Sequence, residues 1–383
     1  SACARAAISG TTPPKLACKS FWPITELPKI TRSARTNAAA VSSHELSMPR
    51  IICSAMRPIR QLRVVSDRGN TPSMSIQYDT SNPLRIGTRG SPLALAQAHE
   101  TRERLMAVHG LAEDRFEIVV IKTTGDAVQD RALSEIGGKG LFTKEIEEAL
   151  LDGSIDIAVH SMKDMPTALP AGLELSTYLP REDVRDAFIS RRYTSLDDLP
   201  KGAVVGTSSL RRRSQLLAHR PDLQVVEFRG NVQTRLRKLD EGVALASFLA
   251  CAGLNRLGLS DIAHPIPTEA MLPAVAQGAI GVEQRIGDRP ISALLAPLDH
   301  AETRLQLAAE RAFLAALDGS CRTPIAALAT RSGDRIQLRG EILRPDGSIR
   351  HAGAWDCQPE DAAKMGHAAG EELKRRAGPG FLD

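Results

Sequence analysis

The segment Ile155-Asp-Ile-Ala-Val-His-Ser-Met-Lys-Asp-Met-Pro166 predicts a buried strand that runs directly into a polar loop. Four of its first five side chains are apolar, which favours a strand covered on both faces. The polar residues that follow include His160, Lys163 and Asp164. Open α/β sheets place their chemistry where strands end, so Asp164 is the first candidate for a functional carboxylate.

Strands alternate with helices on the N-terminal side of this segment. The pattern predicts strands at 84–88 and 116–123, a helix from Ser91-Pro92 to about Val108, and a helix over 141–151. Ser91 is a typical N-cap, and proline is favoured at the first helical position. The alternation predicts an α/β fold with a mostly parallel sheet and helices on both faces.

A second unit repeats this scheme further along the chain. It predicts strands at 203–207 and 223–228 and helices that open at Ser208 and Asn231. In both units a strand ends in Gly-Thr and a serine caps the next helix. Two such units would place two helix N-termini at one cleft, where exposed N–H groups attract anions. Ordinary capping explains either motif taken alone.

The C-terminal part predicts a small α+β third domain. Helices are expected at 303–317 and 360–376, with a hairpin of strands 336–343 and 348–355 between them. Cys321 lies in a turn beside Arg322, and a neighbouring cation favours the reactive thiolate. An inert thiol is the alternative for a cysteine considered alone.

Residues 1–80 differ in charge from the rest of the chain. Eleven Lys/Arg against four Asp/Glu give them a formal charge of +7, so with +4 overall the remaining 303 residues carry −3. This segment is rich in Ser, Ala, Thr, Pro and Arg and lacks the apolar core of a secretory signal, which is typical of an organelle transit peptide. A disordered tail without a targeting role is the alternative.

Arginine is concentrated in the middle of the chain, with seven between Arg211 and Arg237. Arg211 and Arg212 fall in the first turn of a predicted helix, where the helix dipole disfavours cations and a bound anion would compensate. A solvated basic face or a nucleic-acid surface is the alternative. The acidic remainder of the chain and the absence of a nucleic-acid motif favour a pocket for a small polycarboxylate.

Several other classes of protein are disfavoured. No apolar run reaches the roughly 18 residues of a membrane span. The cysteines outside the leader, 251, 321 and 357, are widely spaced, which indicates neither a disulfide framework nor a zinc site. No cluster has metal-ligand spacing, and neither a dinucleotide fingerprint nor a phosphate-binding loop is present. With 3% aromatic residues, stacking on nucleic-acid bases is also disfavoured.

Seven motifs follow one another over about residues 84–383. They are Arg85-Ile-Gly-Thr-Arg-Gly-Ser-Pro-Leu-Ala-Leu95, Gly137-Gly-Lys-Gly-Leu-Phe142, His160-Ser-Met-Lys-Asp164, Gly206-Thr-Ser-Ser-Leu-Arg-Arg212, Arg229-Gly-Asn-Val232, Leu272-Pro-Ala-Val-Ala-Gln-Gly278 and the turn that holds Cys321. In this order they resemble the porphobilinogen deaminases, also called hydroxymethylbilane synthases. Seven motifs in a family's own order are a very specific signal.

The resemblance implies three domains after a leader at 1–80. Domain 1 would span 83–180 and 278–297, domain 2 would span 184–274, and domain 3 would span 301–383. The first two would resemble periplasmic binding proteins around a cleft, and the protein would be a monomer. Val184, Ser320, Thr323 and residues 276–279 look closer to plant and algal members, so the leader is expected to direct the protein to the chloroplast, with the mitochondrion as the alternative.

The implied activity is a transferase of tetrapyrrole biosynthesis, which leads to heme and chlorophyll. Four porphobilinogen molecules would condense head to tail to hydroxymethylbilane, each losing ammonia, on a covalent dipyrromethane cofactor. By motif position Cys321 would form the thioether to the cofactor, and Asp164 would be the catalytic acid–base and cation-stabilising group. The acetate and propionate on every pyrrole would explain the arginines.

The resemblance also implies binding residues, with no metal, membrane or nucleic-acid partner. Besides Cys321, cofactor contacts are implied for Lys163, Asp164, Thr207, Ser209, Arg211, Arg212, Arg229 and Gly230. Substrate contacts are implied for Arg89, Ser91, Lys139, Arg229, Arg235, Arg256 and Gln277, with the Lys139 loop as a lid. The alternative function is a non-catalytic carboxylate-binding protein of the periplasmic type, which would need neither Asp164 nor Cys321.

Overall fold

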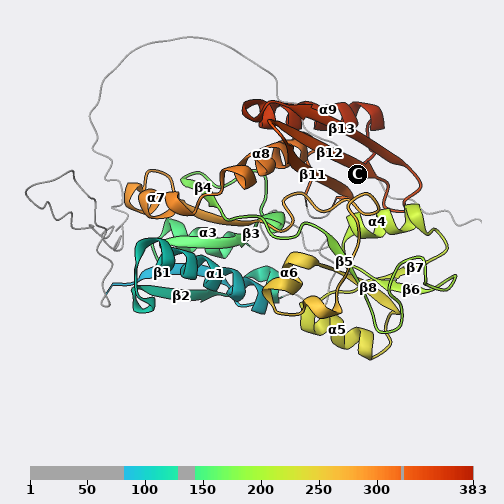
Figure 1. Ribbon diagram of the computed structural model, residues 1–383, viewed down its shortest axis with the longest axis horizontal. Coiled ribbons are helices and arrows are strands. Elements are labelled where there is room, and N and C mark those ends of the chain that lie inside the picture. The colour runs from blue at the N-terminus through green and yellow to red at the C-terminus, as the bar shows by residue number, and fades with distance from the viewer. Residues whose placement is uncertain (1–81, 128–142, 321–322, 383) are drawn as a thin grey trace, which may run out of the picture. The chain divides into compact units, whose positions relative to one another are not determined.

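The computed structural model describes residues 82–127, 143–320 and 323–382 (Figure 1). All of them belong to one unit, Pro58–Asp383. Within these ranges no helix has both the length and the apolar character needed to cross a bilayer. The unit contains three sheets, each covered by helices.

The first sheet has five strands in the order β2-β1-β3-β10-β4. The strands are β1 (Leu84–Arg89), β2 (Phe116–Ile121), β3 (Ile157–Ser161), β4 (Leu173–Tyr178) and β10 (Ile280–Arg285). Strands β1, β2 and β3 run parallel, whereas β10 is antiparallel to both of its neighbours, β3 and β4. The strand β10 returns from far along the chain to complete this sheet.

Helices cover both faces of the first sheet. They are α1 (Pro92–His109), α3 (Lys144–Leu151) and α7 (Arg289–Leu295), and the short helix α2 (Thr124–Ala127) follows β2. Leu105 of α1 and Leu294 of α7 pack with Ile86 and Ile157 in one core cluster. On the other face Ile146 and Leu150 of α3 pack against Ala158, so the central strand is apolar on both sides, as its sequence predicts.

The second sheet repeats the arrangement, with the order β7-β6-β8-β5-β9. Its strands are β5 (Asp186–Ser190), β6 (Val204–Gly206), β7 (Gln224–Val226), β8 (Ala246–Ala250) and β9 (His264–Pro265). Its helices are α4 (Leu210–His219), α5 (Val232–Asp240) and α6 (Cys251–Arg256). Leu216 of α4 packs on one face, and Leu239 of α5 and Leu254 of α6 pack on the other.

The third region is an antiparallel sheet of three strands covered by two long helices. The strands are β11 (Ile325–Ser332), β12 (Arg335–Leu343) and β13 (Arg350–Cys357), and the helices are α8 (Ala301–Ala316) and α9 (Ala362–Ala377). Figure 1 shows both helices beside this sheet. Phe313 of α8 and Leu373 of α9 are fully buried in its core. The predicted combination of two α/β sheets and a small α+β region is confirmed.

The first two sheets are mostly parallel, as predicted: in each, four of the five strands run in one direction, and β10 or β5 runs antiparallel to both of its neighbours. One local expectation is wrong, because helix α4 is capped by Ser209 rather than Ser208. The Ser208 hydroxyl instead accepts a hydrogen bond from the backbone N–H of Phe228 at 3.0 Å, so it ties β6 to the segment after β7.

A buried ion pair joins the third region to the segments that connect the two larger sheets. Arg181, which follows β4, donates to both carboxylate oxygens of Glu310 on α8 at 2.7 and 3.0 Å. Glu310 is fully buried and also accepts from the backbone N–H of Ala276 at 2.6 Å. Arg181 further donates to the carbonyl of Gln277 at 2.9 Å. The pair therefore fixes the chain on either side of Gln277.

Candidate active site

Strand β3 and a 3-10 helix at Met162–Asp164 place Asp164. The backbone N–H of Met162 donates to the carbonyl of Ala279 at 3.0 Å, and the Met162 side chain is 1% exposed. A Cβ at residue 281 would lie 2.2 Å from the Met162 sulfur, so the glycine there leaves space for this side chain in its observed position. The buried methionine anchors the turn, and Asp164 emerges two residues later.

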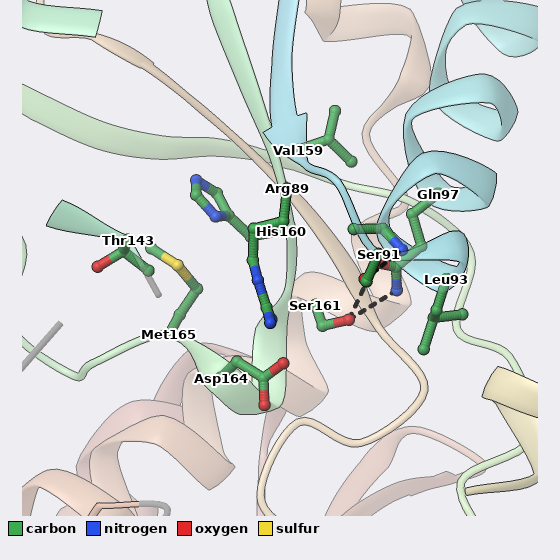
Figure 2. A pocket seen from close by; sticks show the side chains of 11 residues that line it. Arg89, Ser91, Leu93, Gln97, Thr143, Val159, His160, Ser161, Asp164 and Met165 are labelled. Carbon is green, nitrogen blue, oxygen red and sulfur yellow. Dashed lines mark hydrogen bonds between the residues drawn. The ribbon is translucent and has the colours of Figure 1, made fainter. Parts of the chain in front are cut away.

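Asp164 lines a pocket at the ends of β1 and β3 (Figure 2). The cavity has a volume of about 60 Å³ and is lined by Arg89, Ser91, Leu93, Ala94, Gln97, Thr143, Val159, His160, Ser161, Asp164 and Met165. Figure 2 shows the side chains of Arg89 and Asp164 directed into this space. Ser161 and Gln97 hydrogen-bond each other, which closes one side of it.

The carboxylate of Asp164 is available for a ligand. Its side chain is partly exposed, and within the described residues it accepts no hydrogen bond and joins no salt bridge. Its negative charge nevertheless acts on Lys163 and on Arg235 of α5. In both cases it partly opposes the lowering of the pKa that burial causes. An unpaired carboxylate among cations can accept or donate a proton, and it can stabilise a positive charge on a bound molecule.

Lys163 follows β3 of the first sheet, and the charges of Arg211 and Arg212 of α4 act on it. Burial, reinforced by the positive charges of Arg212 and Arg211, lowers the pKa of its ammonium to about 8, although Asp164 and Asp186 oppose the shift. The ammonium donates to the side-chain oxygen of Gln277 at 3.5 Å. Lys163 is therefore charged at neutral pH and loses its charge as the pH rises through about 8.

The first turn of α4 carries two buried arginines that share one carboxylate. Arg211 and Arg212 are 4% and 5% exposed, and Asp186 at the start of β5 is fully buried. Arg211 donates to Asp186 at 2.7 Å, and Arg212 donates to it at 2.6 and 3.1 Å. Burial alone would raise the pKa of Asp186, but the two guanidinium groups hold it well below its usual range. The positive charge of the two arginines at the start of α4 is therefore partly neutralised by Asp186.

The predicted cofactor residues Thr207 and Ser209 lie at the same helix start. Thr207 is 4% exposed and accepts a hydrogen bond from the backbone N–H of Ser209 at 3.2 Å. Ser209 accepts from the backbone N–H of Arg212 at 3.4 Å as the N-cap. Both hydroxyls are engaged in local structure and keep a lone pair or proton for a further partner.

Arg229, Gly230 and Arg235 form a second cationic element, on which the charge of Asp164 acts through Arg235. The Nη1 atom of Arg229 is buried without a hydrogen-bond partner. Gly230 has a φ of +118°, and a Cβ there would lie 2.5 Å from Thr234 Cγ2, so no other residue fits. Arg235 donates to the carbonyl of Gly230 at 2.9 Å, and burial followed by the charge of Arg212 lowers its pKa to about 10.

Arg256 and Gln277 hold the segments around the site. Arg256 of α6 is paired with Glu100 of α1 at 2.9 Å and donates to the carbonyl of Gly278 at 3.2 Å. Gln277 is 1% exposed and donates to the carbonyl of Val184 at 2.8 Å and to Asp186 at 3.0 Å. The predicted ligand contacts of both remain predictions. Their observed contacts connect the two larger sheets.

Two of the predicted site residues, Lys139 and Cys321, lie outside the described residues. Arg256 joins α6 to α1, and the others occur in three groups. Arg89, Ser91 and Asp164 line the pocket; Arg211, Arg212, Gln277 and Lys163 contact or act on one another around Asp186, with Thr207 and Ser209 at the same helix start; and Arg229, Gly230 and Arg235 form the second cationic element. Charge interactions of Arg235 with Asp164 and Arg212 connect the three groups.

Sequence reasoning missed Asp186, the acceptor of both arginines. The signal for it is an acidic residue at the start of an otherwise apolar strand, Asp186-Ala-Phe-Ile. It missed Glu283 as well, which is fully buried in β10. A carboxylate inside an apolar strand is seldom buried without a partner, which makes such positions candidates for a paired group.

Comparisons with known proteins point to one family. Residues 84–293 match the family model described as porphobilinogen deaminase, dipyromethane cofactor binding domain, and residues 305–375 match porphobilinogen deaminase, C-terminal domain. The porphobilinogen deaminase of Paracoccus denitrificans is 64% identical over 311 residues, which cover 81% of this chain and 99% of that protein.

Similar solved structures include two proteins at low identity. A periplasmic substrate-binding protein of an ABC transporter from Coxiella burnetii is 17% identical, with 56% of this chain and 91% of that chain covered and a TM-score of 0.36. A YaeC-family lipoprotein from Enterococcus faecalis is 16% identical, with 56% and 90% covered and a TM-score of 0.33. The family models and the bacterial relative decide the assignment: this chain belongs to the porphobilinogen deaminase family.

Proposed function

We propose that this protein is a hydroxymethylbilane synthase, which condenses four porphobilinogen molecules head to tail and releases ammonia at each addition. Family membership supports the reaction class. The observation that carries the proposal is Asp164, an unpaired carboxylate in a pocket beside Arg89, with Lys163 and Arg235 within electrostatic reach. The cations suit the substrate's two carboxylates, and the carboxylate suits its amine.

Asp164 would act on the reacting end of the substrate. The departing amine must carry a proton, and Asp164 can hold a proton for it or stabilise its ammonium form. When the amine leaves, positive charge develops on the substrate, and a fixed carboxylate stabilises that charge. After the new carbon–carbon bond forms, a proton is lost from the pyrrole ring, and the same carboxylate can accept it.

The described residues fit a dipyrromethane with several carboxylates. Arg229 has a buried nitrogen without a partner, and Arg211 has another at its Nε atom. Arg229 and Lys163 would hold carboxylate groups, and Ser209 would donate a further hydrogen bond. When bound, the dipyrromethane supplies the pyrrole position that receives the incoming unit. Cys321 would provide the covalent attachment.

A turnover assay tests this proposal. Purified protein is incubated with porphobilinogen, and the consumption of substrate, the release of ammonia and the formation of hydroxymethylbilane are measured together. Four ammonia molecules per hydroxymethylbilane are expected. Saturable binding of porphobilinogen without ammonia release, by protein that already carries a covalent pyrrole, would contradict the synthase and support a carboxylate-binding protein.

Cys321→Ser is expected to give a protein without covalent pyrrole, because serine cannot form the thioether. Intact-protein mass spectrometry measures the loss of the adduct, and turnover falls to the background rate. Cys357→Ser, at a partly buried cysteine of β13, serves as the matched control and is expected to keep the adduct. An adduct retained by Cys321→Ser would place the attachment at another residue.

Arg229→Leu is expected to weaken binding of porphobilinogen. A hydrogen bond to a charged group contributes about 1.5–3 kcal/mol, which corresponds to about a 10- to 100-fold increase in apparent KM. Steady-state kinetics measure the change. Arg237→Leu, at a side chain that is 69% exposed and paired with Glu241, is the control and should leave KM unchanged. Equal kinetics in both variants would remove Arg229 from the binding site.

The leader and the oligomeric state complete the proposal. The basic, acid-poor composition of residues 1–80 supports import into the chloroplast, with the mitochondrion as the alternative. Fusion of residues 1–80 to a fluorescent protein tests this in plant cells, where uniform cytosolic fluorescence would count against import. A monomer is proposed for the folded protein, and light scattering after size-exclusion chromatography measures its mass.

A further inference from the structure

Three titratable side chains meet in the core behind the pocket. Glu147 on α3 is 7% exposed, His160 on β3 is 6% exposed, and Glu283 on β10 is fully buried. The Nε2 atom of His160 lies 3.0 Å from Oε2 of Glu283, and His160 also lines the pocket with Asp164. This buried cluster therefore extends from the interior of the first sheet to the pocket.

Each carboxyl group of the cluster has one oxygen without a partner. Oε1 of Glu147 and Oε1 of Glu283 are both buried and make no hydrogen bond with any residue that the structure describes. A buried carboxylate oxygen without a donor costs free energy, and two such oxygens on ionised groups would also repel each other. Glu283 pairs with Ala158 across β10 and β3, and α3 packs on the face of the sheet that carries Ala158. Glu147 and Glu283 therefore lie on the same face of the sheet, where the negative charge of Glu283 acts on Glu147. One proton between the groups would remove both penalties.

We propose that Glu147 and Glu283 share one proton, and that this carboxyl pair holds His160, and with it the loop that carries Lys163 and Asp164, in position. The pair then has a charge of −1, with a carboxylic O–H donated from one group to the other. The remaining oxygen of Glu283 faces His160. Glu147 and Glu283 are positioning residues, since they reach the pocket only through His160.

The surroundings of Glu147 agree with a protonated acid. Burial is the largest influence and raises the pKa of Glu147. The groups that act on it are Thr143, which precedes α3, Glu283 of β10, His160 of β3 and Glu148 of its own helix. Thr143 and His160 oppose the shift, whereas the negative charges of Glu283 and Glu148 add to it.

The linkage between protonation and folding gives the pH dependence. An acid with a raised pKa in the folded state contributes stability that is fully present below its unfolded pKa of about 4.3. This stability is lost as the pH rises through the folded value. Glu147→Gln mimics the protonated acid and cannot ionise, so the variant is expected to gain melting temperature relative to the wild type as the pH increases.

Infrared spectroscopy and thermal unfolding of the full-length protein test the shared proton. At neutral pH the wild type is expected to show the C=O band of a buried carboxylic acid that shifts in D2O, and Glu147→Gln and Glu283→Gln are each expected to lose it. Glu148→Gln is the matched control, because Glu148 is on the same helix and 63% exposed. It should keep both the band and the wild-type pH dependence of melting.

Two results would overturn the proposal. One is that the wild type at neutral pH shows no carboxylic-acid C=O band, or only a band that is still present in Glu147→Gln. The other is a melting difference between Glu147→Gln and the wild type that is already constant from pH 6 to pH 9, because both carboxyl groups would then be ionised throughout. Either result means that the oxygens are not joined by a proton.

The positioning role rests on the proposed function and has its own measurement. As Glu147 ionises, a second negative charge beside Glu283 disturbs the His160 contact, so wild-type kcat is expected to fall on the alkaline side of the profile. Glu147→Gln should remove the part of that fall that follows ionisation of Glu147, leaving KM unchanged and leaving the part that follows loss of charge at Lys163. Glu147→Ala cannot ionise either, but it offers Glu283 no hydrogen-bond donor, so its kcat should be lowered at every pH. Identical profiles in all three would overturn the positioning role. If the wild type does not consume porphobilinogen, the proposed function fails, whereas the infrared band still decides the shared proton.

Discussion

Replacement of Asp164 with asparagine is expected to lower kcat by about 10²- to 10⁴-fold, the usual contribution of a positioned acid–base group. Asparagine has nearly the same shape but can neither carry the proton of the departing amine nor balance the positive charge that develops on the substrate. KM should change much less, because the cationic side chains that bind the substrate carboxylates remain. Steady-state measurement of ammonia release gives both constants.

The fold is expected to survive this change. Within the described residues Asp164 accepts no hydrogen bond and forms no salt bridge, so its replacement should alter stability by no more than about 0.5 kcal/mol. Asp197→Asn, at a side chain that is 78% exposed, is the control for both activity and melting. An Asp164→Asn protein that keeps wild-type kcat would refute the catalytic assignment, and one that unfolds would show a structural role.

Asp186→Asn is expected to have the largest effect on stability. It removes the negative charge that two buried arginines share, and breaking a buried ion pair by removal of one partner costs about 3–5 kcal/mol. Urea unfolding measures the loss. Asp240→Asn breaks an exposed pair in which the Arg191 side chain is 46% exposed and the Asp240 side chain 53% exposed, and it should cost far less because solvent screens such a pair. Equal losses in the two variants would contradict this account of Asp186.

The effect of Asp186 also has a predicted pH dependence. Its pKa in the folded protein is lowered, so its contribution to stability is present above the unfolded value of about 3.9 and is lost as the pH falls below it. The difference in unfolding free energy between wild type and Asp186→Asn should therefore shrink in acid. A difference that grows below pH 4 would mean that the arginines do not lower this pKa.

Local signals in the sequence predicted the start of α1 well. Ser91 caps α1 and Pro92 occupies its first turn, as the Ser-Pro pair indicates, because capping depends on residues close in sequence. In the second unit two adjacent serines both satisfy the capping pattern. The hydrogen bond that distinguishes Ser208 from Ser209 joins Ser208 to Phe228, 20 positions further along the chain. A rule based on neighbouring residues therefore cannot predict which serine is the cap.

The antiparallel direction of β10 and β5 within the first two sheets could not be predicted from periodicity. Strand β10 pairs with β3 although 118 residues separate Ser161 from Ile280, and a buried strand has the same apolar pattern in either direction. The pairing of Arg211 and Arg212 with Asp186 could not be predicted either. The sequence indicates an excess of cations near the start of one helix. Which carboxylate of the chain reaches these cations depends on how β5 packs against α4.

The most direct test of the central claim is intact-protein mass spectrometry of the purified protein, with peptide mapping, before and after a limiting amount of porphobilinogen. The account predicts a resting mass increased by two linked pyrrole units on the peptide that contains Cys321, and further increases by single pyrrole units after substrate is added. The opposite result is a resting protein that carries this adduct and binds porphobilinogen reversibly but gains no mass from it. That result would contradict the synthase activity.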